Sequence, residues 1–205
     1  MALFITFEGE EGSGKTVQTR ALYRKLTRLA IPALLTHEPG GTVAGEKIAR
    51  WLKWAHGVGI SPLTELLMFN ASRSQLVEEV IQPALKSGKV VICDRYADST
   101  LAYQGCGRGL DLEMVGAVNN AATRGLKPGL TILLDLSFEA GLARKINRKH
   151  DRFEQESIAF HRRVRQGYLK LAAAEPERWL VIDASQSKEE ISKIIWQRVS
   201  RLLKD

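Results

Sequence analysis

The fold is decided by residues 3–16, which read LFITFEGEEGSGKT. This stretch opens with an apolar run of strand-forming residues, continues through a glycine-rich turn and leads into a helical pattern. The turn matches G-x-x-x-x-G-K-[S/T], the pattern of a loop whose backbone N–H groups surround a phosphate. The alternative is a glycine-rich turn that binds nothing, but the strand before it and the helix after it favour the phosphate-binding loop.

The residue types of this loop predict its chemistry. Glycines let the backbone approach a phosphate closely. Lys15 can reach the β- and γ-phosphates of a nucleotide, and the hydroxyl of Thr16 can be a ligand of Mg²⁺. The residues expected to hold the nucleotide are Gly9, Glu10, Glu11, Gly12, Ser13, Gly14, Lys15 and Thr16.

The length and composition are those of an ordinary globular protein. The chain has 205 residues, of which 44% are hydrophobic and 26% are charged, and this length predicts one domain and at most two. No stretch of about 18 uncharged apolar residues is present, so we expect no membrane span. The N-terminus shows no signal-peptide pattern, and the two cysteines form neither a disulfide framework nor a metal cluster. We therefore expect a cytoplasmic protein.

The charge balance is basic, because 30 Lys and Arg residues outnumber 23 Asp and Glu residues and the formal net charge is +7. A basic protein suits anionic partners, which include nucleotides, nucleic acids and membrane surfaces. The net charge does not choose among them.

Apolar strand-like runs alternate with helical patterns along the whole chain. This alternation predicts an α/β fold in which helices cover both faces of a parallel sheet. Ligands of such sheets bind beyond the carboxyl ends of the strands. The expected strands are 3–7, 33–37, 90–94, 130–135 and 179–183, and the expected helices are 15–29, 44–54, 63–87, 112–122, 138–148, 154–173 and 189–203.

Two charged residues, Asp94 and Arg95, follow the apolar run of the third expected strand. An acidic residue at the end of such a strand is where phosphate-loop proteins keep a carboxylate near Mg²⁺. An adjacent arginine could bind a second phosphate through two hydrogen bonds. The alternative interpretation is an ion pair on the surface.

A basic segment, residues 144–152, joins two helical patterns and reads RKINRKHDR. One interpretation is a solvated helix face, which charge runs usually are. The other is a lid that closes over phosphates, with Arg144 and Arg148 on one helix face. We favour a lid at about residues 144–154, because the same chain holds a phosphate loop.

Further motifs resemble those of bacterial thymidylate kinases, and the resemblance covers nearly the whole chain. The phosphate loop alone would indicate only a nucleotide-binding superfamily, whereas the motifs around it are much more specific. These motifs are FEG at 7–9 with GKT at 14–16, EPGGT at 38–42, ELLMFNASR at 65–73, DRY at 94–96 with ST at 99–100 and AYQG at 102–105, and DRFE at 151–154.

The resemblance implies a fold, a reaction and an assembly. The fold would be the three-layer sandwich of P-loop NTPases, with five parallel strands flanked by helices in a single domain over residues 1–205. In the reaction, MgATP would give its γ-phosphoryl group to dTMP and form dTDP and ADP. The protein would be a homodimer, with ATP and Mg²⁺ as cofactors and no nucleic-acid or membrane partner.

The resemblance also implies roles for individual residues. Lys15 and Thr16 would hold the ATP phosphates and Mg²⁺, and Asp94 would support the metal. The groups around dTMP would be Phe69 on the thymine ring, Arg73 at its edge, Thr100 and Gln104 completing the base pocket, Tyr103 crowding the 2′ position, Glu11 at the 3′-hydroxyl or its surrounding water, and Arg95 at the phosphate. Because the loop has no arginine, the lid residues Arg144, Arg148 and Arg152 would supply the cation of the transition state.

Two of these residues have a plainer interpretation. Phe69 could be a core aromatic at helical spacing, but its neighbours 66–68 can fill the core, and Phe69 shares one helix face with Arg73 four residues later. Tyr103 could be a packing tyrosine whose hydroxyl finds a partner. We expect both residues to line the substrate site.

Some positions depart from the family pattern. Val17 stands where a second hydroxyl is frequent, and His37 stands where an arginine is usual. Ala49 occupies a position that tends to be arginine, and Arg50 is one step away. The lid is one residue short after Arg148. These departures concern phosphate contacts and lid geometry, and they leave the reaction class intact.

Two other functions compete with the dTMP kinase. One is a related enzyme that accepts another nucleotide or nucleoside, and the base pocket would decide this. The other is a basic ATP-dependent nucleic-acid-binding protein, although no aromatic platform is interleaved with the charges of the C-terminal half. Candidates for a dimer surface are Trp51, Trp54 and the helix over 63–69, each of which could equally belong to the core.

Overall fold

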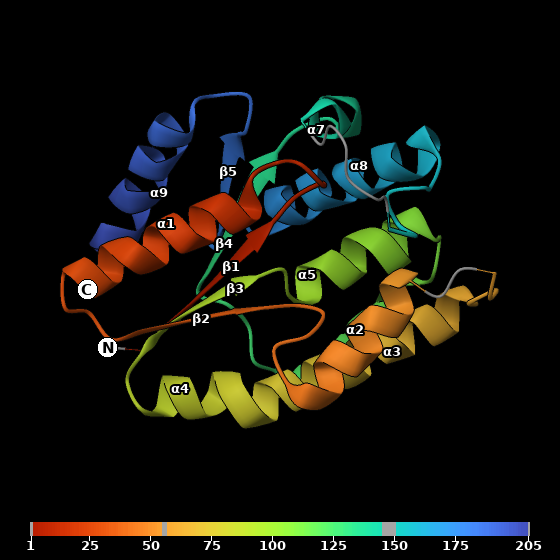
Figure 1. The fold of residues 1–205 in the computed structure, drawn as a ribbon, viewed down its shortest axis with the longest axis horizontal. Coiled ribbons are helices and arrows are strands. Elements are labelled where there is room, and N and C mark those ends of the chain that lie inside the picture. Colours follow the sequence, from red (N-terminus) through yellow and green to blue (C-terminus); the bar gives the residue numbers. More distant parts are fainter. Residues whose placement is uncertain (1, 55–56, 145–150, 205) are drawn as a thin grey trace.

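The structure is a computed structural model, and it describes residues 2–54, 57–144 and 151–204. Among these residues, five parallel strands form one sheet in the order β2-β3-β1-β4-β5 (Figure 1). The strands are β1 (Leu3–Glu8), β2 (Ala33–His37), β3 (Val90–Asp94), β4 (Leu130–Asp135) and β5 (Trp179–Asp183). The predicted parallel sheet is confirmed, and only β1 differs from its predicted bounds, because it continues to Glu8.

Helices cover both faces of the sheet, as the sequence predicted. Figure 1 shows α1 and α9 on one side of the sheet, and α4 and α5 on the other. The described helices are α1 (Lys15–Arg28), α2 (Val43–Trp54), α3 (Pro62–Leu76), α4 (Gln82–Lys86), α5 (Ala97–Thr100), α6 (Leu112–Thr123), α7 (Phe138–Ala143), α8 (Ile158–Ala174) and α9 (Lys188–Leu202), with two π-helical segments, η1 (Val77–Ile81) and η2 (Leu101–Gly107). The three-layer sandwich is therefore present.

Successive strand residues point to opposite sides of the sheet, so a strand that is apolar throughout makes both faces apolar. On one side, Ile5 and Phe7 of β1 pack in one cluster with Leu26 of α1 and Ile195 of α9. On the other side, Phe4 packs with residues of α3, η1 and β3. Strands buried on both faces explain why their sequences are continuous apolar runs.

Four predicted helices lie within one residue of their observed bounds, and three differ more. The predicted helix over 63–87 is α3, η1 and α4 in succession, with the π segment in its middle. Of the helix predicted over 138–148, α7 ends at Ala143, and positions 145–150 lie outside the described residues. The predicted start at 154 is wrong, because α8 begins at Ile158, where the hydroxyl of Ser157 accepts the N–H of Phe160 at 3.2 Å and caps the helix.

The sequence reasoning missed the helical stretch formed by α5 and η2. This stretch contains two glycines, which are poor helix formers, and it is held by its packing on α8. A Cβ on Gly107 would lie 2.7 Å from the ring of Phe160, and one on Gly167 would lie 2.7 Å from the sulfur of Cys106. The close contact between η2 and α8 decides this local structure, and it brings residues 100–104 to the site.

No helix in the described part of the chain is long and apolar enough to cross a membrane.

Candidate active site

The glycine-rich loop follows β1 directly and runs into α1, which begins at Lys15. Gly9, Gly12 and Gly14 have φ angles of 135°, 74° and 95°, which side chains rarely allow. A Cβ on Gly12 would lie 2.2 Å from the carbonyl oxygen of Gly141 in α7. Gly9 and Gly12 therefore could not carry a side chain without moving the backbone, and the positive φ angle of Gly14 favours glycine there.

Lys15, the first residue of α1, folds back over the loop. Its ammonium group donates to the carbonyl oxygens of Gly9 at 3.0 Å and Glu10 at 2.8 Å. Burial lowers the pKa of Lys15 to about 8, and the neighbouring charge of Arg95 acts in the same direction. The loop thus presents a buried cation beside the backbone N–H groups at the start of a helix, which is the arrangement that binds phosphate oxygens.

Thr16 and Asp94 meet at the carboxyl end of β3. The hydroxyl of Thr16 donates to Oδ2 of Asp94 at 2.6 Å. Across the described ranges, no group of three or more His, Cys, Asp and Glu side chains could hold a metal ion. Two hard oxygen groups beside a phosphate loop nevertheless fit Mg²⁺, because this ion takes few protein ligands and completes its shell with phosphate and water.

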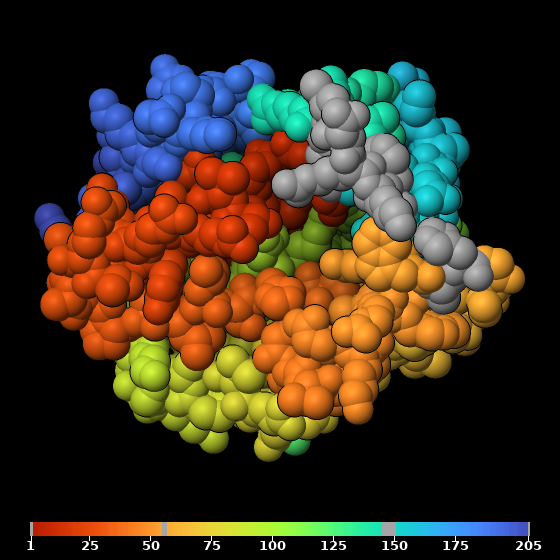
Figure 2. Space-filling model, in the orientation of Figure 1, coloured from red at the N-terminus to blue at the C-terminus, as the bar shows by residue number. Residues whose placement is uncertain are grey.

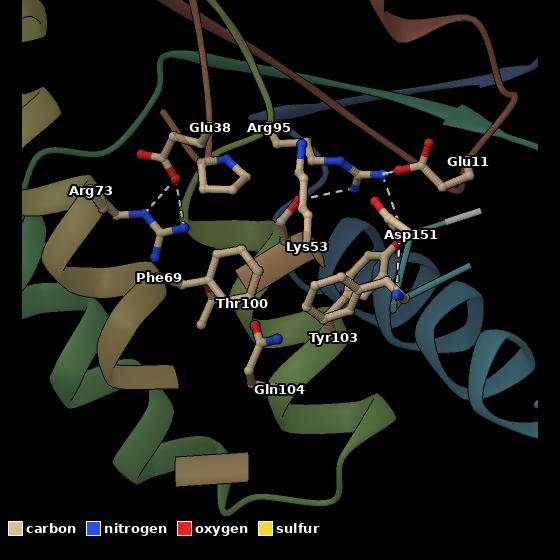
Figure 3. Close-up of a pocket in the computed structure, with 13 residues that line it drawn as sticks. Glu11, Glu38, Lys53, Phe69, Arg73, Arg95, Thr100, Tyr103, Gln104 and Asp151 are labelled. Carbon is tan, nitrogen blue, oxygen red and sulfur yellow. Dashed lines mark hydrogen bonds and ion pairs between the residues drawn. The ribbon is translucent and has the colours of Figure 1, made fainter. Parts of the chain in front are cut away.

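Two pockets lie next to this loop. The phosphate-loop pocket is lined by residues of the loop, α1 and β2, together with Asp94, Arg144 and Lys188. The aromatic pocket is lined, among others, by Phe69, Arg73, Thr100, Tyr103, Gln104 and Phe153 (Figure 3). The residues that line both pockets are Glu11, Glu38, Lys53 and Arg95. Figure 2 shows this face of the molecule hollowed, with green parts of the chain lying deeper between red and orange parts.

Arg73 and Glu38 form a buried ion pair on one side of the aromatic pocket (Figure 3). The guanidinium lies 2.7 Å from the carboxylate, and the side chains are 1% and 3% exposed. Asn119 and the carbonyl oxygen of Tyr96 accept further hydrogen bonds from Arg73 at 2.8 and 3.1 Å. Burial raises the pKa of Glu38, and the adjacent Arg73 opposes this shift. The pair fixes the guanidinium in one orientation at the pocket wall.

Arg95 forms a second ion pair, with Glu11, on the other side of the aromatic pocket. Arg95 has a φ angle of 69°, a left-handed conformation that is uncommon for this residue type. Its guanidinium also donates to the hydroxyls of Ser99 and Tyr168, both at 3.3 Å, and it lies 5.2 Å from the ring centre of Tyr103. These contacts aim the charge of Arg95 at the junction of the two pockets.

Glu8, which sequence reasoning missed, holds the partners of Arg95. Its carboxylate accepts the N–H of Tyr96 at 2.8 Å and hydrogen bonds from the hydroxyls of Ser99 at 2.5 Å and Tyr168 at 2.9 Å. Burial raises the pKa of Glu8 to about 7, with a smaller contribution from Asp98. Its position directly before the phosphate loop was the available signal, but Tyr168 lies 160 residues away in sequence.

Aromatic rings gather in the aromatic pocket, as predicted for Phe69 and Tyr103. The ring centre of Phe153 lies 5.6 Å from that of Phe69 and 6.2 Å from that of Tyr103. Phe69 is half-buried, whereas Tyr103 is 7% exposed. The structure thus brings the predicted residues into one pocket, while Phe153 also places an aromatic ring there.

Glu65 organises the polar side of this region and was not predicted as a site residue. Its fully buried carboxylate accepts hydrogen bonds from Gln104 at 2.7 Å, Arg108 at 3.1 Å and Arg152 at 2.6 Å. Thr100, also buried, lines the aromatic pocket together with Gln104. Gln104 is therefore fixed by Glu65.

The predicted lid residues lie in different places. Arg144 donates to the carbonyl oxygen of Ala184 at 2.9 Å and lines the phosphate-loop pocket. Arg152 donates to the carbonyl oxygen of Leu52 at 3.1 Å and to Glu65, and it lines neither pocket. Arg148 lies outside the described residues.

Glu10 contributes its backbone to the loop but turns its side chain into the protein. The carboxylate is buried; it accepts a hydrogen bond from the hydroxyl of Tyr103 at 3.4 Å and lies 3.1 Å from Nδ1 of His161. His161 had no signal in the sequence, because a single histidine on a helix is most often a core residue. The predicted role of Glu10 in nucleotide binding rests on its backbone alone.

The structure places the positions that depart from the family pattern. Val17 is exposed and lines the phosphate-loop pocket, and His37 pairs with Glu46 at 3.0 Å. Ala49 is 5% exposed, whereas Arg50 points to solvent and lines neither pocket. Arg50 therefore brings no charge to the site.

Comparison with known proteins agrees with this geometry. Residues 7–195 match the family model "Thymidylate kinase". A thymidylate kinase of Dehalococcoides mccartyi is 58% identical over 204 residues, covering 100% of this chain and 99% of that protein, and one of Deinococcus radiodurans is 51% identical over 199 residues, covering 97% and 96%. A crystal structure of thymidylate kinase from Ehrlichia chaffeensis superposes with a TM-score of 0.75 at 35% identity, covering 88% of this chain and 92% of that one. The chain belongs to the thymidylate kinase family.

Proposed function

We propose that this protein transfers the γ-phosphoryl group of ATP to the phosphate of dTMP, giving dTDP and ADP. The observation that carries the proposal is the junction of the two pockets, where Glu11, Glu38, Lys53 and Arg95 line both. One pocket has the groups that bind nucleotide phosphates, and the other has aromatic rings and polar edges that suit a base. A donor and an acceptor bound in these pockets face each other end to end, which is the alignment that phosphoryl transfer requires.

In the proposed site, the loop residues from Gly9 to Thr16 hold the ATP phosphates. Lys15 contacts the β- and γ-phosphates, and Arg144 lines the same pocket. Thr16 and Asp94 would hold Mg²⁺, which would cancel negative charge on the phosphates. Arg148 and Arg152 complete the proposed lid, and Arg152 is anchored to Glu65 in this structure.

In the acceptor site, Phe69 stacks on thymine and Arg73 binds the edge of the base. The base pocket is completed by Thr100 and Gln104, while the ring of Tyr103 crowds the 2′ position, Glu11 lies near the 3′-hydroxyl and Arg95 binds the phosphate. The acceptor is an ionised phosphate oxygen, so the reaction needs no side chain to remove a proton. Alignment and charge cancellation are then the main work of the protein.

We also propose a homodimer that uses the outer face of α2 and α3, which pack on each other. Large apolar side chains of this face are exposed, and they are Val43, Trp51, Trp54, Leu63 and Leu67. Monomeric proteins rarely expose so many large apolar groups together. A second copy of the chain is the occupant that the family resemblance implies.

The domain organisation and the location are proposals of the same kind. All five described strands belong to one sheet, which supports a single domain over residues 1–205. Cys93 and Cys106 are free thiols, as a reducing compartment such as the cytoplasm allows.

The test is an ADP-release assay with MgATP and a panel of nucleoside monophosphates. We expect dTMP to give the highest kcat/KM and omission of Mg²⁺ to abolish turnover. Preference for another monophosphate would assign a different acceptor. Absence of ADP release at saturating dTMP would contradict the proposed reaction.

A further inference from the structure

Lys53 occupies the junction of the two pockets, and the sequence motifs did not single it out. It lies in the last turn of α2, and four side chains line both the phosphate-loop pocket and the aromatic pocket. Two of these are the anions Glu11 and Glu38, and the other two are the cations Arg95 and Lys53. The phosphate of an acceptor bound in the aromatic pocket has to lie at this junction, because the donor phosphates lie in the other pocket.

The charges at the junction are unequally paired. Glu38 is bound to Arg73 at 2.7 Å, and Glu11 is bound to Arg95. No hydrogen bond or salt bridge joins the ammonium group of Lys53 to another described residue; its charged neighbours Glu46 and Asp151 act through longer-range attraction. In the view of Figure 3, the Lys53 side chain lies between the two ion pairs.

The backbone around Lys53 is held in place. Its carbonyl oxygen accepts the backbone N–H of Arg152 at 3.2 Å, and the carbonyl oxygen of Leu52 accepts a bond from the Arg152 guanidinium at 3.1 Å. The side chain of Leu52 is fully buried. The last turn of α2 is thus anchored by the two hydrogen bonds from Arg152 and by the buried side chain of Leu52. The flexible four-carbon stem of Lys53 leaves its ammonium group able to move onto a ligand.

We propose that Lys53 is a second cation for the acceptor phosphate, acting from the side opposite Arg95. A nucleoside monophosphate brings close to two negative charges, and the Arg95–Glu11 pair offers little net charge to balance them. Lys53 supplies the missing positive charge and donates hydrogen bonds to the phosphate. It also offsets the repulsion between acceptor and donor phosphates as they approach. This inference rests on the proposed dTMP kinase activity.

The test compares Lys53→Met with Arg50→Met, a matched control that removes an exposed cation from the same helix. Binding of dTMP and of thymidine, which lacks the phosphate, is measured by titration calorimetry. For Lys53→Met we expect dTMP affinity to fall about ten- to a hundredfold, as for loss of a charge-assisted hydrogen bond. Thymidine affinity and the KM for ATP should stay within about twofold. Arg50→Met should match the wild type, and Lys53→Arg should recover most of the dTMP affinity.

Two outcomes would overturn the role of Lys53. One is unchanged dTMP affinity in Lys53→Met. The other is an equal loss for dTMP and thymidine, which would mean that the substitution disturbs α2 rather than a phosphate contact. Circular dichroism of each variant reports whether the fold is intact. Turnover of dTMP by the wild-type protein tests the proposed kinase activity separately. If the wild type turns over dTMP, either outcome contradicts only the role of Lys53.

Discussion

The Nδ1 atom of His161 lies 3.1 Å from Oε2 of Glu10, and both side chains are at most 1% exposed. The other ring nitrogen lies 3.1 Å from the carbonyl oxygen of Phe153, which can only accept a hydrogen bond. Nε2 therefore donates to this carbonyl oxygen, which leaves Nδ1 facing the Glu10 carboxylate. The ring also stacks on Phe138 at 3.5 Å. Through His161, the phosphate loop is connected to α7 and to the segment that precedes α8.

Removal of His161 should destabilise the protein. His161→Ala leaves the Glu10 carboxylate buried without its main partner, and its other oxygen already has no hydrogen bond within the described structure. The expected loss is about 3–5 kcal/mol in the free energy of unfolding, measured by urea denaturation. Arg162→Ala, at the exposed next position, should change stability by no more than about 0.5 kcal/mol. Equal stability of the two variants would show that the Glu10–His161 contact contributes nothing.

Glu8 should make the stability fall as the pH rises. Its pKa in the folded protein is about 7, above its ordinary value of 4.5, because burial disfavours the carboxylate. The folded state thus binds the proton more tightly, so this stabilisation is complete below pH 4.5 and is lost as the pH rises through about 7. The side chain in Glu8→Gln cannot titrate. Between pH 4.5 and about 7, the unfolding free energy of this variant should therefore fall less than that of the wild type, by roughly 3 kcal/mol. Parallel curves for the two proteins would assign the shift to other groups.

Phe69 should affect the acceptor and leave the donor unchanged. Phe69→Ala removes the ring that is proposed to stack on thymine, and stacking of a base on an aromatic side chain contributes about 1–3 kcal/mol. The KM for dTMP should therefore rise about ten- to a hundredfold, while the KM for ATP stays within about twofold. Ser74→Ala, an exposed position of the same helix, is the control. Similar increases for both substrates would identify Phe69 as a core residue instead.

The exposed face of α2 and α3 should determine the oligomeric state. Trp51→Glu places a charge on this face, where the indole is 41% exposed, and a charge buried in an apolar interface is costly. Sedimentation analysis should show a dimer for the wild type and a monomer for the variant. Leu29→Glu, at an exposed apolar position after α1, should remain dimeric. A wild-type monomer, or a dimeric Trp51→Glu, would rule out this face as the interface.

Much of the fold could be predicted because the evidence for it is local. Strands buried on both faces are continuous apolar runs, so four of the five described strands have their predicted bounds. The missed stretch over 97–107 is a counterexample, since its π-helical part is held by close packing of η2 on α8 through Gly107 and Gly167. Helix ends were less certain, because a single capping hydroxyl such as that of Ser157 moves the start of a helix.

The phosphate loop could be read from the chain because glycine placement and the adjoining strand and helix act over a few residues, through steric limits on the backbone. The pairing of the charged residues in the site could not be predicted from the chain. Arg73 meets Glu38 across 35 residues, Arg95 meets Glu11 across 84, and His161 meets Glu10 across 151. Each pairing depends on how the packed sheet and helices bring distant segments together, and burial then makes the choice of partner decisive. The sequence by itself therefore identifies the loop that binds phosphate. The tertiary packing decides which charged side chains pair with each other and which cations are left to bind the substrate phosphates.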